Sequence, residues 1–252
     1  MTSLFLCLFF LLGCQPEEVS SSTPETDTTA TVIPSSALSP ATAPSDNPQV
    51  IKYLALGDSY TIGQSVPEEG RWPVQLAAKI NEHTDECHLS DPFIIATTGW
   101  TTANLSDAMD NMMIDTAQFD LVSLLIGVNN QYQGLSLDAY EVEYEALLDR
   151  AIALAGGNPE RVFVVSIPDY GYTPFGEPNQ ASISAELAQF NAACQTITED
   201  HGVAHYNITP ISQQWPDTPN LVASDNLHPS DVQYGMWVDS FWEDVFFQIT
   251  NN

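Results

Sequence analysis

A serine, a histidine and an aspartate lie where they could form a nucleophilic site. Ser59 closely follows an apolar run at residues 54–57, and Asp225 and His228 are three residues apart in the segment Ser-Asp-Asn-Leu-His-Pro. In a turn, this spacing lets the carboxylate reach Nδ1 of the imidazole while Nε2 points outward. A histidine held in this way can remove the proton of a serine hydroxyl, which then attacks a carbonyl carbon. Because Gly-Asp-Ser is also ordinary turn chemistry, the prediction depends on all three residues together.

Hydrolysis of an ester also needs hydrogen-bond donors for the developing oxyanion. The main-chain N–H of Ser59, the main-chain N–H of Gly99 and the side-chain amide of Asn129 are neutral donors, and each follows an apolar run. Without a side chain, Gly99 lets the main chain approach a substrate closely. Taken singly, Gly99 is a turn residue and Asn129 a loop entry, but together with Ser59 they form a candidate oxyanion hole.

Five apolar runs alternate with helical patterns along the chain. The runs cover residues 54–57, 93–97, 121–126, 162–167 and 203–208. This alternation predicts a parallel sheet with helices on both faces, which is a three-layer α/β/α sandwich. The carboxyl ends of parallel strands lie at one edge of a sheet, so Ser59, Gly99 and Asn129 can meet there.

Residues that favour helix starts precede three of the helical patterns. Thr101 or Thr102 could cap a helix that continues to Met113, Ser136 could cap a long helix, and the last helix is expected from about Ser230. The candidate histidine lies just before this last helix, after the fifth apolar run. The predicted base therefore reaches the same edge of the sheet as the predicted nucleophile.

The amino-terminal segment has the pattern of an export signal. Residues 1–13 are apolar and too few to span a bilayer as a mature helix. Leu-Leu-Gly-Cys at residues 11–14 resembles the lipobox of bacterial lipoproteins, which implies that Cys14 is lipidated and anchors the protein. No Lys or Arg precedes it, and a plain secretory signal or an uncleaved anchor are the alternatives. With Gln15 after Cys14, the resemblance implies a cell-envelope protein, at the outer membrane in preference to the inner one.

Composition divides the rest of the chain into a tether and one domain. Residues 14–49 are rich in Ser, Thr and Pro and hold too few large apolar groups to fold, so they are interpreted as a disordered tether. Residues 50–252 then form a single domain with all 5 basic and 28 of the 33 acidic residues, a formal charge of −23. Such a surface repels nucleic acid and anionic lipid. We expect a monomer that acts on a small-molecule or glycan ester and touches the membrane only through Cys14.

Two cysteines remain in the predicted domain. Cys87 and Cys194 could form a disulfide in an exported protein. Cys194 also falls on the apolar stripe of a predicted helix, where a free buried thiol is equally consistent. A cluster of His, Asp, Glu and Cys residues at 83–88 follows a helix at the edge of the sheet opposite Ser59. No metal site is therefore predicted.

Four segments together resemble the sequence blocks of the SGNH hydrolases, also called the GDSL esterases and lipases. The segments are Gly57-Asp58-Ser59, Gly99, Gly127-Val128-Asn129-Asn130 and Asp225-Asn226-Leu227-His228. The resemblance spans residues 51–247 and implies a flavodoxin-like sandwich with a five-stranded parallel sheet, carboxyl-ester hydrolysis and no metal or organic cofactor. By position, it implies that Ser59 is the nucleophile and, with Gly99 and Asn129, an oxyanion donor. It also implies that His228 is the base and that Asp225 orients it.

The chain departs from the family pattern at two positions. Asn130 stands where the third block usually has Asp, which alters a structural hydrogen bond. Tyr60 stands where Leu is commoner after the serine, which alters the wall beside the nucleophile. Tyr60, Trp100 and Tyr132 are the predicted substrate contacts, and a loop at residues 168–180 is expected to shape the acyl or alcohol pocket.

These features favour a serine esterase for short acyl chains or acetylated carbohydrates. A lysophospholipase or lipase of the same family is one alternative. Another is a non-catalytic surface lipoprotein that binds a glycan or a partner through aromatic residues such as Trp100, Tyr132, Tyr170 and Tyr172. The nucleophile elbow of the α/β-hydrolases is excluded, because Ser59 does not stand in a Gly-x-Ser-x-Gly segment.

Overall fold

The computed structural model describes residues 48–251. The predicted signal sequence, the predicted lipid anchor at Cys14 and all but the last two residues of the predicted tether lie outside these residues. Among the helices that the structure describes, none combines the length and the apolar composition needed to cross a membrane.

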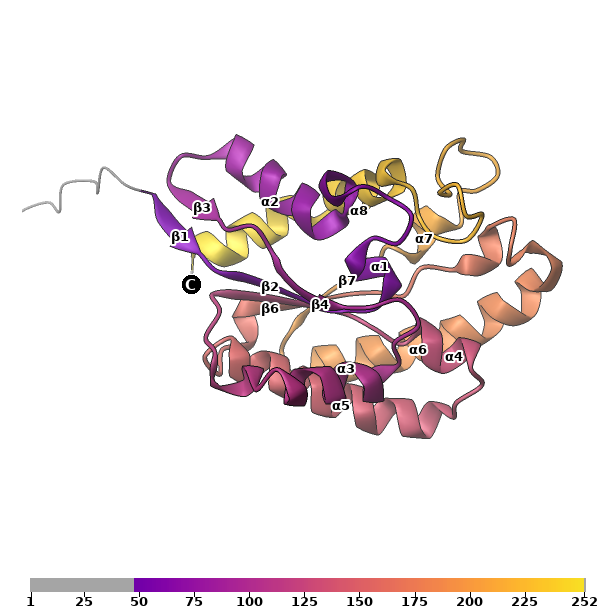
Figure 1. Cartoon of the computed structure of the whole chain (residues 1–252), viewed down its shortest axis with the longest axis horizontal. Helices are drawn as coiled ribbons and strands as arrows, with labels where there is room; N and C mark the ends of the chain where they lie inside the picture. The colour runs from indigo at the N-terminus through magenta and orange to yellow at the C-terminus, as the bar shows by residue number, and fades with distance from the viewer. Residues whose placement is uncertain (1–47, 252) are drawn as a thin grey trace, which may run out of the picture. The chain divides into compact units, whose positions relative to one another are not determined.

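Five parallel strands of the described chain form the central sheet, in the order β4-β2-β5-β6-β7 (Figure 1). They are β2 (Tyr53–Gly57), β4 (Phe93–Ala96), β5 (Leu121–Leu125), β6 (Val162–Val165) and β7 (Ala204–Tyr206). Every residue of β2, β5 and β6 is buried, because helices cover both faces of these inner strands. The order and the direction of the strands confirm the predicted five-stranded parallel sheet.

Helices form one layer on each face of the sheet (Figure 1). The first layer contains α2 (Trp72–His83) and α8 (Asp231–Thr250), and the second contains α3 (Thr102–Asn111), α5 (Leu137–Leu154) and α6 (Gln180–Asp200). Trp72 of α2 and Phe241 of α8 both pack on Phe163 of β6, with ring centroids 6.2 and 5.9 Å from that of the phenylalanine. This buried aromatic cluster joins the first layer to the sheet, and the three layers confirm the predicted sandwich.

Short helices connect the long elements. They are α1 (Ser59–Ile62), α4 (Val128–Tyr132), α7 (Thr209–Ser212) and the 3-10 helices η1 (Glu68–Gly70), η2 (Ile114–Thr116), η3 (Pro159–Arg161), η4 (Tyr170–Tyr172) and η5 (Glu177–Asn179). α1 begins just after β2, and α4 begins just after β5. These two short helices therefore lie at the carboxyl ends of neighbouring strands, where the sequence placed the candidate nucleophile and one oxyanion donor.

Side chains cap three of the long helices, two at predicted caps and one at the predicted start of the last helix. Thr101, Ser136 and Ser230 each accept a hydrogen bond from a main-chain N–H in the first turn of the helix that follows. The predicted extension of α3 to Met113 was wrong. The helix ends at Asn111, because Met113 adopts a left-handed conformation with φ of 51° and immediately precedes η2.

A second, two-stranded sheet was not predicted. It pairs β1 (Gln49–Ile51) in parallel with β3 (Cys87–Leu89). Residues 83–88 thus end α2 and begin β3, and within residues 48–251 no three His, Cys, Asp or Glu side chains are placed to hold a metal ion. Cys87 and Cys194 are both buried and both free thiols.

Candidate active site

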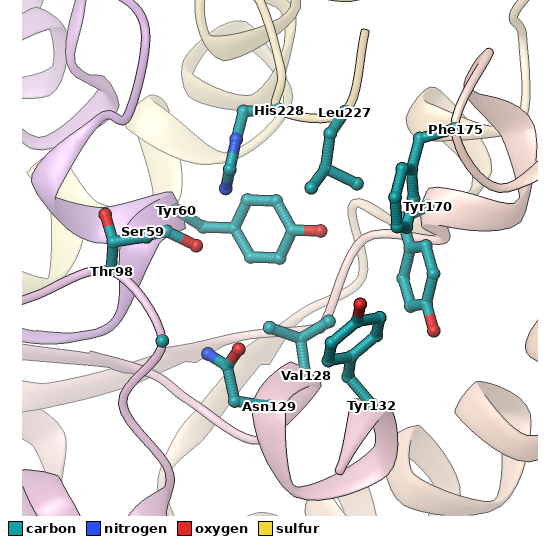
Figure 2. A pocket seen from close by; sticks show the side chains of 11 residues that line it. Ser59, Tyr60, Thr98, Val128, Asn129, Tyr132, Tyr170, Phe175, Leu227 and His228 are labelled. Carbon is teal, nitrogen blue, oxygen red and sulfur yellow. The ribbon is translucent and has the colours of Figure 1, made fainter. Parts of the chain in front are cut away.

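A cavity of about 240 Å³ lies at the carboxyl ends of β2, β4 and β5 (Figure 2). It is lined by Ser59, Tyr60, Thr98, Gly99, Val128, Asn129, Tyr132, Tyr170, Phe175, Leu227 and His228. Of the residues predicted for the catalytic and substrate sites, all but Asp225 and Trp100 line this cavity. Asp225 and Trp100 each hold a lining residue through a hydrogen bond.

The backbone around Gly57 explains how Ser59 reaches the cavity. A Cβ atom at Gly57 would lie 2.5 Å from the main-chain oxygen of Leu125 and 2.2 Å from Oγ1 of Thr61. Only glycine therefore allows α1 to start so close to the ends of β2 and β5. Asp58 caps α1 by accepting the N–H of Tyr60 at 3.0 Å, and this cap holds the Ser59 segment at the edge of the sheet.

Asp225 and His228 form the hydrogen-bonded pair that their spacing predicts. Nδ1 of His228 lies 2.7 Å from Oδ2 of Asp225, and Oδ1 accepts the main-chain N–H of Leu227 and of His228 at 3.0 Å each. Burial acts to raise the pKa of Asp225, but hydrogen bonds from Ser65, the two N–H groups and the imidazole outweigh it and hold the pKa well below the usual range. The carboxylate thus stays ionised and favours the tautomer of His228 that carries its proton on Nδ1.

The imidazole of His228 points toward the hydroxyl of Ser59 across the cavity (Figure 2). No hydrogen bond joins the two side chains in the described structure. Catalytic hydrogen bonds are often long in the absence of substrate and shorten when it binds. The arrangement therefore leaves Nε2 of His228 as an acceptor that faces the candidate nucleophile.

Three donors surround the space beside Ser59. Within residues 48–251, the main-chain N–H groups of Ser59 and Gly99 have no hydrogen-bond acceptor. Gly99 has φ of 87°, a conformation that favours glycine, and a Cβ atom there would meet no protein atom within 4 Å. Nδ2 of Asn129 donates one hydrogen to the carbonyl of Trp100 at 2.9 Å, so its second hydrogen remains for a ligand. The half-buried indole of Trp100 packs against the core and does not line the cavity.

Asn130 connects two of the donor-bearing segments. Its Oδ1 accepts the N–H of Thr102 at 3.1 Å, and its Nδ2 donates to Oγ1 of Thr102 at 2.6 Å. The hydroxyl of Thr102 in turn donates to Glu143. A carboxylate at position 130 could accept but not donate, so the amide suits this hydrogen-bonded chain. Asn130, which departs from the family pattern, thus links the segment that follows Gly99 to the segment of Asn129 by hydrogen bonds.

Tyr60 forms part of the wall beside the imidazole. Its ring lies edge-on to that of His228, with centroids 5.7 Å apart. Burial, followed by the charge of Asp58, raises the pKa of Tyr60 well above its usual value, so the phenol stays neutral. Its hydroxyl points into the cavity (Figure 2) and has no hydrogen-bond partner among the described residues. The wall thus offers a neutral polar group to a ligand.

Aromatic side chains close the end of the cavity away from Ser59 (Figure 2). Tyr132, Tyr170 and Phe175 lie with their ring centroids 6.2–6.4 Å apart. The N–H of Phe175 donates to the carbonyl of Asn226 at 3.0 Å, which joins this wall to the loop that carries His228. Lining residues missed by the sequence prediction are Thr98, Val128, Phe175 and Leu227. Val128 and Leu227 lie within predicted blocks, Thr98 precedes the predicted donor Gly99, and Phe175 lies in the loop predicted to shape the pocket. These positions were the available signal.

The fold and the cavity have the arrangement of a serine hydrolase of the SGNH class. Residues 55–235 match the GDSL-like Lipase/Acylhydrolase family, and the chain belongs to this family. The resemblance stated from the four sequence segments is thereby confirmed. A comparison with curated protein sequences finds no match.

Several solved structures share the fold, and two of those named below are esterases. The chain is similar to the psychrotrophic esterase EstA from Pseudoalteromonas sp., inhibited by monoethylphosphonate in that structure, with a TM-score of 0.58, 19% identity and coverage of 82% of this chain and 100% of that one. It is also similar to Axe2, an acetylxylan esterase from Geobacillus stearothermophilus, with a TM-score of 0.61, 19% identity and coverage of 79% and 95%. A third structure, TesA, has a TM-score of 0.61 at 12% identity and coverage of 79% and 99%. At identities of 12–19%, these similarities show the fold alone.

Proposed function

We propose that the protein is a serine esterase that cleaves neutral carboxylic esters with short acyl chains, such as acetylated carbohydrates. The observation that carries this proposal is the pair of Asp225 and His228, hydrogen-bonded at 2.7 Å, which directs the imidazole toward Ser59. Membership of the GDSL-like Lipase/Acylhydrolase family supports the reaction class.

In the proposed mechanism, Oγ of Ser59 attacks the carbonyl carbon of the ester while Nε2 of His228 accepts the hydroxyl proton. The oxyanion accepts hydrogen bonds from the N–H of Ser59, the N–H of Gly99 and the amide of Asn129. His228 then gives its proton to the leaving alcohol, and an acyl-enzyme forms on Ser59. Water that loses a proton to His228 attacks this ester, and the carboxylic acid is released.

The charge of the site favours a neutral substrate. None of the residues that line the cavity, all within the described chain, is Asp, Glu, Lys or Arg. The predicted domain has a formal charge of −23, so it repels anionic lipids and uronic acids. The carboxylate product is repelled by the same field, which favours its release.

The size and lining of the cavity support a small acyl group and a ring-shaped alcohol. A volume of about 240 Å³ is small for a ligand pocket. Tyr132 and Phe175 are each about half exposed at its far end, where they could stack on the apolar face of a sugar ring. The hydroxyl of Tyr60 could bond a sugar hydroxyl. The acetylxylan esterase among the similar structures supports this substrate class.

Substitution of the nucleophile tests the reaction. Ser59→Ala should abolish hydrolysis of p-nitrophenyl acetate while circular dichroism and the melting temperature remain those of the wild type. A fluorophosphonate probe should label the wild type and leave the variant unlabelled, because the probe needs an activated serine. Wild-type turnover in the variant would refute the assignment. An unlabelled but folded wild type would instead favour the non-catalytic binding protein.

A substrate panel separates the proposed esters from the alternative in the same family. It contains p-nitrophenyl acetate, butyrate and octanoate, acetylated xylo-oligosaccharides and lysophosphatidylcholine. We expect kcat/KM to be highest for the acetyl esters and to fall with chain length. A preference for octanoate or lysophosphatidylcholine would replace the proposal with a lipase or lysophospholipase.

We also propose that the protein is exported to the cell envelope and anchored there through a lipid on Cys14. The support for this proposal is the sequence of residues 1–14. A fatty-acid analogue supplied to cells that express the full chain should label the wild type but not Cys14→Ala. Equal labelling of the two proteins would contradict the anchor.

A further inference from the structure

The carboxylate of Asp225 receives a hydrogen bond from a residue outside every predicted segment of the site. Oγ of Ser65 donates to Oδ2 of Asp225 at 2.6 Å. The same oxygen faces Nδ1 of His228 at 2.7 Å. Among the described residues, Ser65 and His228 are the two side chains that bond this carboxylate. Ser65 therefore contacts the very oxygen that would orient the catalytic base.

The backbone of Ser65 adopts a conformation that serine usually avoids. Its φ is 69°, in the left-handed region that favours glycine. The other described non-glycine residues with positive φ are Met113, Asn220 and Asn226. A conformation of this kind persists where surrounding contacts hold it, and it occurs often at functional sites. The conformation directs the hydroxyl of an exposed loop residue toward the loop that carries the base.

The loop at residues 63–66 also reaches the other side of the site. The N–H of Gln64 donates to the carbonyl of Ser59 at 2.9 Å, which folds the loop back on α1. Oγ1 of Thr98 donates to Oε1 of Gln64 at 2.6 Å, and Thr98 precedes the oxyanion donor Gly99. Two consecutive residues thus connect the segment of the nucleophile to the segment of the oxyanion hole and to that of the base.

We propose that Ser65 is a positioning residue of the active site, whose hydroxyl holds the carboxylate of Asp225 in the orientation that accepts the Nδ1 proton of His228. The proposal rests on the proposed role of His228 as the base. A hydrogen bond to an ionised acceptor is stronger than one between neutral groups. The side chain of Asp225 is 30% exposed, so water replaces the serine when the hydroxyl is removed, and the carboxylate gains freedom to turn away from the imidazole.

Ser65 also affects how the carboxylate stabilises a protonated His228. A carboxylate that turns away from Nδ1 stabilises less well the imidazolium that forms when His228 accepts the proton of Ser59. Because this charge forms in the transition state and not in the bound substrate, removal of the Ser65 hydroxyl should lower kcat with little change in KM.

The other titratable groups near the imidazole are the same in the wild type and in the Ser65 variants. Asp225 is on the same loop, and Tyr60 of α1 packs against the ring. Asp58 and Tyr234 interact electrostatically with Tyr60. Burial keeps both tyrosines neutral, and it raises the pKa of Asp58 to about 7. Among the described residues, no hydrogen bond joins Ser65 to Tyr60, Asp58 or Tyr234, so an effect of its substitution reports on the carboxylate of Asp225.

Two substitutions of Ser65 separate its hydroxyl from its backbone conformation. Ser65→Gly removes the hydroxyl but suits a φ of 69°, whereas Ser65→Ala removes the hydroxyl and retains the unfavourable conformation. Asn220→Gly is the matched control, because Asn220 is exposed, has φ of 63° and lies outside the cavity. Both Ser65 variants should lose about tenfold in kcat/KM for p-nitrophenyl acetate, the lower end of what a hydrogen bond to a charged group contributes. The control should keep wild-type values.

NMR of the His228 ring provides a readout that does not need turnover, because the resonance of its Nδ1–H proton reports on the hydrogen bond to Asp225. The measurement is made in the Ser59→Ala background, with and without Ser65→Gly. A changed Nδ1–H resonance of His228 in the absence of the Ser65 hydroxyl supports the proposal even if no ester is cleaved, and the failure of the proposed function is then seen separately as an unlabelled Ser59. An unchanged resonance together with unchanged kcat/KM in both Ser65 variants overturns the proposal. Impairment of Ser65→Ala alone also overturns it, because the backbone and not the hydroxyl would then matter.

Discussion

Replacement of Asn130 by aspartate, the residue usual at this position of the family's third sequence block, should destabilise this chain at neutral pH. At acid pH, its stability should be that of the wild type. The side chain is 1% exposed. Its amide donates to Oγ1 of Thr102 at 2.6 Å, and the hydroxyl of Thr102 donates to Glu143. A carboxylate at position 130 cannot donate, so two carboxylates would compete for the single hydroxyl proton of Thr102.

The expected loss follows from the hydrogen bond and from the charge. A buried polar group without a hydrogen-bond partner lowers the free energy of unfolding by about 1–3 kcal/mol. Repulsion between the new carboxylate and Glu143 lowers it further. We expect the free energy of unfolding to fall by about 2 kcal/mol at pH 8, which for a domain of about 200 residues lowers the melting temperature by about 4–8 °C. Burial and Glu143 raise the folded-state pKa of the new carboxyl above its unfolded value of about 3.9. The loss should therefore be absent below about pH 4 and grow as the pH rises toward the folded-state pKa.

Urea unfolding at pH 4 and pH 8 measures this difference. A second substitution, Glu143→Gln, provides the control, because the new amide can donate to Thr102 while the hydroxyl of Thr102 donates to the carboxylate at position 130. The double variant Asn130→Asp/Glu143→Gln should recover most of the stability lost at pH 8. Wild-type stability of Asn130→Asp at pH 8, or an equal loss at both pH values, would refute the reasoning. Failure of the second substitution to restore stability would show that this hydrogen-bonded chain is not the cause.

Three further substitutions follow from the site. Asn129→Ala should lower kcat for p-nitrophenyl acetate by roughly a hundred- to a thousandfold with little change in melting temperature, and a loss within about threefold would assign Asn129 to the loop alone. Tyr60→Phe should raise KM for an acetylated xylo-oligosaccharide more than KM for p-nitrophenyl acetate, because only the sugar can use the hydroxyl in the cavity; equal changes would contradict this role. Asp58 has a folded-state pKa raised by burial to about 7, so its contribution to stability is lost as the pH rises from about 4 to about 7. Asp58→Asn should therefore gain stability relative to the wild type between pH 4 and pH 8 in urea unfolding, and a constant difference would show that Asp58 does not titrate in this range.

Local patterns predicted the architecture because each depends on neighbouring residues. Continuous apolar runs indicated strands that are buried on both faces, and Ser136 and Ser230 marked helix starts by side chains that accept a main-chain N–H. The end of α3 was mispredicted, since the left-handed turn at Met113 has no glycine to mark it. β1 and β3 were missed because each is only three residues long and pairs with a segment far away in sequence.

Contacts between segments far apart in the sequence could not be predicted from local sequence patterns. The hydrogen bond between Ser65 and Asp225 joins residues 160 positions apart, and the sequence around either residue does not indicate that it contacts the other. The indole of Trp100 turned out to pack on the core, while its carbonyl holds Asn129 at 2.9 Å. An aromatic residue in a predicted loop does not reveal which of its groups faces the site.

The sequence by itself determined the strand and helix pattern, the family and the positions of Ser59, Asp225 and His228. It did so because a strand end, a turn and a three-residue spacing are local properties of the chain. The tertiary structure decided what surrounds these residues: the neutral hydroxyl of Tyr60 in the wall, the aromatic end of the cavity and the bond from Ser65 to the carboxylate that contacts His228. These depend on how loops from different strand ends pack together at one edge of the sheet, and packing of this kind is set by the whole fold.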